Sequence, residues 1–307
     1  MESVLITVVA FHLLAANLAG AGPFVAAWAD WHGRRRNRLE LQFAGLQLIR
    51  WSMLAALVGV GLGLVAWIEL AYCPPRSQGS FWWLLRRSIS TERWWFITDE
   101  ITFYLVCLST CAFLCNRLYR HRWLIWLLAV AAGTNLLYHF PPLFTVLAIK
   151  FEQHDWRLLD HTAFLHQMLA PEAVARILHV WLASFATAGL ALAWIGSLAL
   201  QPTQIENDPS PHSSVARTGG RWSLWATMLQ IPVGVWILFA LPDVQGERIM
   251  VGNPIFFGGI VVALGLMHQL AMLSLGDISR RRLSVATLML IIAVILMTAA
   301  LECSRPI

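Results

Sequence analysis

Long apolar stretches alternate along the chain with short polar segments, and each stretch approaches the length that a helix needs to cross a lipid bilayer. About 20 apolar residues suffice, because an α-helix rises about 1.5 Å per residue and the hydrocarbon core is about 30 Å thick. We therefore expect an all-α membrane protein, a single bundle of about eight transmembrane helices within residues 1–307. The predicted spans are 3–29, 43–72, 97–116, 122–150, 171–200, 221–242, 254–277 and 283–302.

Two segments outside these spans have patterns of their own. Residues 80–95 combine Phe, Trp and Leu with paired Arg, which is typical of an amphipathic helix lying on a membrane surface. Residues 201–220 are rich in Pro and Ser and predict a flexible linker.

Arginines gather in alternate loops, and this asymmetry predicts an orientation. The arginine-rich loops are 30–42, 117–122, 201–221 and 278–282, whereas most acidic residues fall in the other loops. By the positive-inside rule the arginine-rich loops face the cytoplasm, so both termini lie outside and residues 80–95 lie on the outer surface.

The composition agrees with a membrane protein, since 58% of residues are hydrophobic and only 13% are charged. This balance excludes an ordinary soluble enzyme. It also leaves no soluble domain for nucleic-acid binding, so we expect no nucleic acid partner.

Histidines inside the predicted spans are the candidate chemistry, because ionisable groups are costly in lipid. His12 and His179 lie roughly 12 Å, and His139 roughly 16 Å, below the predicted outer ends of three different helices. His268 lies near the midplane. Each alone is also explained by a hydrogen bond to a neighbouring helix.

One pair of residues favours a haem over that simpler explanation. Arg176 precedes His179 by three residues, about one helical turn toward the outer surface. A haem iron takes His or Met as axial ligands, and an arginine one turn away could hold a propionate.

Several segments, in order along the chain, carry a resemblance to a known family. They are AFHLLAANLAGAGPFVAAW, MLAALVGVGLGLVAWIEL, FITDEITFYLVCLST, GTNLLYHFPPLF, PEAVARILHVWLASFATAG, RIMVG and LECSRPI. Together they resemble subunit I of the cytochrome bd quinol oxidases. That family has a membrane bundle with haems on its outer, periplasmic side, and the resemblance covers nearly the whole chain.

The resemblance implies a role for particular residues. His12, Glu100 and Glu302 correspond to residues of the catalytic high-spin haem site. His179 and Met250 correspond to the two ligands of the low-spin b haem, with Arg176 and Arg248 assisting. The residues implied as direct iron ligands are His12, His179 and Met250. We include His139 and His268 among the candidate cofactor-binding residues because of their depth in the spans.

The resemblance also implies a function, with departures that leave alternatives open. It implies a haem-binding electron-transfer protein of the bacterial inner membrane, with dioxygen reduction at the high-spin haem and a second membrane subunit. The loop between the sixth and seventh spans is short, whereas the family has a long quinol-binding loop there, so the donor is a quinol or a periplasmic cytochrome c. Asn253-Pro254 starts the seventh span, so His268 or Met267 is the alternative to Met250.

Two other function classes remain. One is a transporter subunit whose histidines handle protons or metal, and the other is a haem-free scaffold of a respiratory complex.

Overall fold

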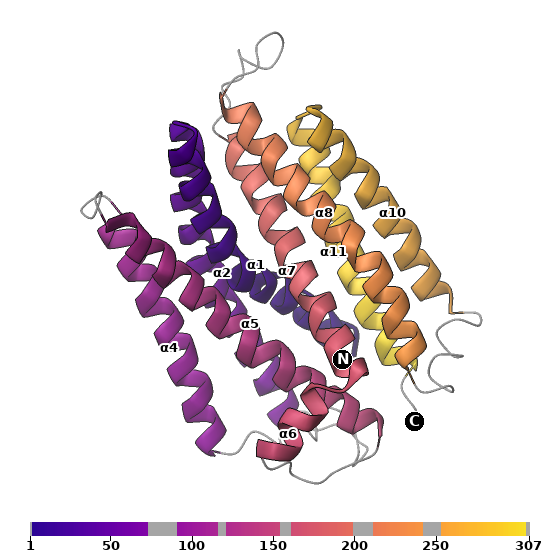
Figure 1. Cartoon of the computed structure of the whole chain (residues 1–307). Coiled ribbons are helices and arrows are strands. Elements are labelled where there is room, and N and C mark those ends of the chain that lie inside the picture. Colours follow the sequence, from indigo (N-terminus) through magenta and orange to yellow (C-terminus); the bar gives the residue numbers. More distant parts are fainter. Residues whose placement is uncertain are drawn as a thin grey trace.

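The computed structural model describes residues 2–72, 91–115, 121–153, 161–198, 211–241 and 253–304. Within them the chain is helical and contains no strand. Eight helices are long and apolar enough to cross a membrane, which confirms the prediction of an all-α, multi-pass membrane protein. The helices (Figure 1) are α1 (Glu2–Arg35), α2 (Leu39–Tyr72), α4 (Thr91–Leu114), α5 (Arg122–Glu152), α6 (His161–Met168), α7 (Pro171–Leu198), α8 (Pro211–Ala240), α10 (Pro254–Leu275) and α11 (Arg280–Ser304).

Some helix ends differ from the sequence prediction. α2 begins at Leu39, inside the predicted loop 30–42, and Leu41 is fully buried there. α8 begins at Pro211, so residues 211–220 are helical and the predicted linker 201–220 is too long. Proline is favoured in the first turn of a helix, and Val215 and Ala216 are buried in this part of α8.

Other predicted segments lie partly outside the described residues. Residues 201–210 and most of the predicted surface helix 80–95 fall there, and residues 91–95 belong to α4. The short helix α6 lies in a segment that the sequence predicted as a loop.

α1 lies at the centre of the bundle, where it packs against α2, α5, α7 and α11. One buried apolar cluster joins α1, α2, α4, α5 and α7. A second joins α7, α10 and α11. Figure 1 shows α7 and α8 running side by side, with α10 and α11 on their far side.

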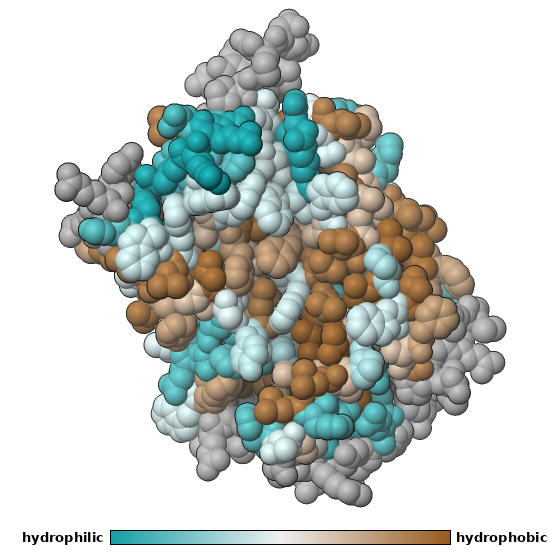
Figure 2. Space-filling model, in the orientation of Figure 1, coloured by the Kyte–Doolittle hydropathy of each residue, from teal (hydrophilic) through white to brown (hydrophobic). Residues whose placement is uncertain are grey.

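The two ends of the bundle are polar and its middle is apolar. Figure 2 shows hydrophilic residues at the upper and lower ends of the visible face and hydrophobic residues between them, over the side where α8 and α10 lie. α1 starts and α11 ends at the lower end in Figure 1, while the α1–α2 and α10–α11 turns lie at the upper end. The assignment of the arginine-rich upper end to the cytoplasm stays a prediction.

Candidate functional site

A buried hydrogen bond between α1 and α7 relates the depths of the two predicted haem-ligating histidines. The hydroxyl of Ser184 donates to Oδ1 of Asn17 at 3.0 Å. His12 precedes Asn17 by five residues, and His179 precedes Ser184 by the same number. Both helices start at the lower end of the bundle, so each histidine lies about 7.5 Å below this bond. The packing of α1 against α7 thus holds both histidines at similar depth.

His12 is held against a glycine-rich face of α2. Its Nδ1 lies 2.8 Å from the carbonyl oxygen of Gly59. A Cβ at Gly63 would lie 3.2 Å from Cε1 of the imidazole, so glycine gives the ring room. When Nδ1 carries the proton and donates to this carbonyl, Nε2 is the basic nitrogen. This backbone-oriented arrangement is typical of metal-ligating histidines.

His179 differs from His12 in the environment of its Nδ1 atom. Its Nδ1 is buried and has no hydrogen-bond partner among the described residues. Unpaired buried polar atoms are uncommon and usually indicate a missing partner or a functional site. Trp181, two residues further along, donates from Nε1 to the carbonyl oxygen of Leu137 at 2.9 Å, which attaches this part of α7 to α5.

Glu100 and His139 form a second group, between α4 and α5. Oε2 of Glu100 lies 3.4 Å from Nδ1 of His139. Asn135 lies against both residues, since its Nδ2 donates to the Glu100 carbonyl oxygen at 2.9 Å and its Oδ1 lies 3.1 Å from His139 Nδ1. Phe96 packs edge-on against the imidazole, with ring centroids 5.3 Å apart. Asn135 therefore holds the carboxylate and the imidazole side by side.

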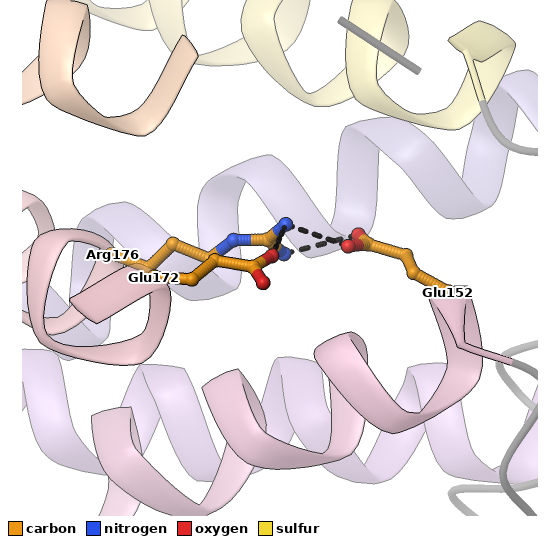
Figure 3. Close-up of polar contacts among 3 residues, drawn as sticks. All are labelled: Glu152, Glu172 and Arg176. Carbon is orange, nitrogen blue, oxygen red and sulfur yellow. Dashed lines mark hydrogen bonds and ion pairs between the residues drawn. The ribbon is translucent and has the colours of Figure 1, made fainter. Parts of the chain in front are cut away.

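Arg176 has two carboxylate partners (Figure 3). Its Nη1 and Nη2 bind the two oxygens of Glu152 at 3.0 and 2.6 Å, and Nη2 also binds Oε1 of Glu172 at 2.6 Å. Glu152 ends α5 and is almost fully buried, with a side-chain exposure of 2%. A guanidinium held in this way would have to release a carboxylate to accept a haem propionate.

The remaining predicted site residues are not brought to this region or lie outside the described residues. His268 is exposed on α10, which packs mainly against α8 and α11. Arg248 and Met250 fall in residues 242–252, which are not described. Glu302 belongs to the last turn of α11, but its side chain is not described.

The donor set suits a porphyrin-held iron better than a bare metal ion. In the part of the chain that the structure describes, no group of three His, Cys, Asp or Glu is placed to hold a metal ion. A haem needs only one or two axial ligands from the protein. His12, with its backbone-oriented ring, and His179, with its unpaired Nδ1, fit that requirement. Arg176 fits it less well.

Comparison with solved structures concerns the fold of the chain. A structure described as bd oxidase from Geobacillus thermodenitrificans superposes with a TM-score of 0.76 and covers 98% of this chain and 85% of that chain. The chain has a bd-oxidase-like fold. The sequence identity is 15%, so the likeness concerns the fold alone. No protein-family model matches the chain, and no curated protein matches its sequence.

The sequence prediction missed two polar groups within the bd-oxidase-like fold. One is the carboxylate pair around Arg176, for which the four-residue spacing of Glu172 and Arg176 was an available signal. The other is at the opposite end, where Asp30 accepts from Trp126 Nε1 at 2.8 Å and pairs with Arg34 Nε at 3.1 Å. Trp126 is distant in the sequence, and no local pattern predicts that contact.

Proposed function

We propose that this protein is a haem-binding electron-transfer subunit of the bd-oxidase type in a bacterial inner membrane. The observation that carries the proposal is the placement of His12 and His179 at similar depth on the adjacent helices α1 and α7. The bd-oxidase-like fold and the resemblance of the sequence to subunit I support it. A haem supplies one-electron redox chemistry and, with an open position on its iron, reactivity toward dioxygen.

Residues of this chain would hold haem at two sites. His179 would hold a low-spin haem b, with Met250 as the predicted second ligand and Arg176 and Arg248 near its propionates. His268 is exposed on α10 and is not proposed as a ligand. His12, fixed by the Gly59 carbonyl, serves a second, high-spin site with Glu100 and Glu302. The Glu100–His139 pair, 3.4 Å apart, would lie beside that site. Both histidines are partly buried by the packed helices.

Spectroscopy of the purified protein tests the proposal. The protein is expressed with haem supplied, and a reduced-minus-oxidised absorption spectrum is recorded with and without carbon monoxide. We expect a b-type band, and a carbon monoxide shift if a high-spin site is present. A band without the shift would indicate an electron carrier rather than an oxidase.

Substitution of His179 assigns the haem to this residue. His179→Ala should abolish the low-spin b-type band, because a haem cannot keep a low-spin state without its axial ligand. His12→Ala should instead remove the carbon monoxide shift and leave the low-spin band. The comparison variant His268→Ala removes an exposed histidine of α10 and should leave the low-spin band unchanged. An unchanged spectrum in His179→Ala would overturn the ligand assignment.

One observation favours a second candidate, a haem-free scaffold of a membrane complex. Arg176, predicted to hold a propionate, is already bound by Glu152 and Glu172. A featureless spectrum from folded, haem-supplied protein that copurifies with a second membrane subunit would support the scaffold. A folded chain that purifies alone and without a chromophore would instead favour the transporter alternative.

A further inference from the structure

A cavity of about 310 Å³ lies at the end of the bundle opposite the histidines. It is enclosed by α1, α2, α5 and the end of α4, near the α1–α2 turn at the upper end in Figure 1. Its lining includes Leu39 and Phe43, whose side chains are 75% and 57% exposed. These exposures place the mouth of the cavity on the surface of the bundle.

The cavity has one polar end and a long apolar wall. Asp30, Gln42 and Arg122 line the polar end, with the indole of Trp126 beside them. Leu46 and Ala129 lie one to two turns deeper along α2 and α5 and line the apolar part. A ligand that fills both parts must be amphiphilic.

The charge of the polar end is unbalanced. Asp30 is satisfied, because it pairs with Arg34 at 3.1 Å and accepts from Trp126 at 2.8 Å. Arg122 has no carboxylate partner among the described residues, and its Nε is buried without a hydrogen bond. The cavity therefore presents a positive charge with an unused donor, and it suits an anion.

We propose that this cavity binds an anionic phospholipid. The phosphate would accept hydrogen bonds from Arg122, and the first part of one acyl chain would lie along the wall that includes Leu46 and Ala129. Basic pockets between membrane helices are suited to anionic headgroups. Arg35 ends α1, Arg36 and Arg38 follow it, and all three add positive potential within a Debye length. This site is separate from the histidines and does not depend on the proposed haem function.

Native mass spectrometry of the full-length protein in detergent tests this proposal. Phosphatidylglycerol and phosphatidylcholine with identical acyl chains are titrated, and bound lipid is counted. We expect phosphatidylglycerol to bind more tightly, and Arg122→Gln to weaken it about tenfold, because a charge-assisted hydrogen bond is lost. Leu46→Trp should reduce binding of both lipids by filling the cavity.

Arg281→Gln is the matched control. It removes one positive charge from the same end of the bundle, at an exposed position of α11 that does not line the cavity. Phosphatidylglycerol binding should be unchanged in this variant. Haem content of all variants should equal that of the parent, which separates this proposal from the function proposed above.

Three results would overturn the proposal. The first is equal affinity of the unaltered protein for the two lipids. The second is equal loss of binding in Arg122→Gln and Arg281→Gln. The third is competition by inorganic phosphate at the same concentration as the lipid, which would reassign the site to a free anion. If Arg122→Gln does not fold, the lipid preference of the unaltered protein, and its loss in Leu46→Trp, decide the question.

Discussion

Several polar side chains within the spans bind across helices. Ser184 donates to Asn17, and Trp194 Nε1 donates to Thr287 Oγ1 at 2.8 Å. Tyr104 is fully buried, and its hydroxyl donates to the Ala19 carbonyl at 2.8 Å. Because water is scarce at this depth, each such bond satisfies a group that has few other partners. The unpaired Nδ1 of His179 contrasts with these residues.

The charge group of Arg176, Glu152 and Glu172 carries one excess negative charge, which gives a test at the scale of single residues. Arg176→Gln should lower the free energy of unfolding by about 3 kcal/mol, because it leaves two partly buried carboxylates without a cation. Glu172→Gln should cost only about 1 kcal/mol, because it keeps the pair between Arg176 and the more buried Glu152. Both values can be measured by reversible unfolding in mixed micelles.

A double variant supplies the control for that comparison. When Arg176→Gln is combined with Glu152→Gln, the most buried carboxylate is replaced by a neutral amide that needs no counter-charge. Part of the lost stability should therefore return. Equal losses in the two single variants would contradict a cation shared by two carboxylates. If haem binds, the band position in Arg176→Gln also reports whether this arginine contacts a propionate.

The depths of two candidate site residues could be predicted from the sequence, whereas the contacts of others could not. The depths of His12 and His179 follow from counting residues from the ends of apolar spans. The partner of Arg176 on α5 could not be predicted, because Glu152 lies 24 residues away and its contact depends on how two helices pack. The contact of His139 with Glu100 has the same origin.

At the scale of helices, glycines let α7 and α8 pack backbone against backbone. A Cβ at Gly219 would lie 2.3 Å from the backbone nitrogen of Ala193 and 2.6 Å from the carbonyl oxygen of Gly189. Backbone atoms cannot move aside as a flexible side chain can. Small residues allow membrane helices to approach this closely.

Alanine substitutions at two glycines of α8 test this contact. Gly219→Ala should lower stability by about 2 kcal/mol, because the added methyl overlaps the backbone of α7. Gly234→Ala, on the same helix, should be neutral or slightly stabilising, because a Cβ there meets no atom within 4 Å. The midpoint of thermal unfolding in detergent measures both. Equal midpoints in the two variants would indicate that α7 and α8 separate easily.

The number of spans was predictable because hydrophobic length alone determines it, whereas helix ends were not. Residues 39–42 and 211–220 are polar enough to resemble loops, yet they continue helices beyond the apolar core. Leu41 and Val215 are buried against other helices, and this tertiary packing outweighs the local polarity.

At the scale of the whole molecule, the fold is similar to that of a solved structure although the two sequences differ at most positions. An identity of 15% accompanies a TM-score of 0.76 against the bd oxidase structure. Lipid permits almost any apolar residue on a helix surface, so most positions can change without altering the bundle. Short segments, such as those around His12 and His179, then carry the resemblance that can be recognised in the sequence.

The shared end of α1 and α11 has a practical consequence for topology. Because α1 starts and α11 finishes at the same end of the bundle, anything attached before one or after the other is exposed to a single compartment. In sealed vesicles, an impermeant protease added from one side should therefore release epitope tags at both ends of the chain, or neither. Release of only one tag would require an odd number of crossings, and the orientation of the vesicles identifies the compartment.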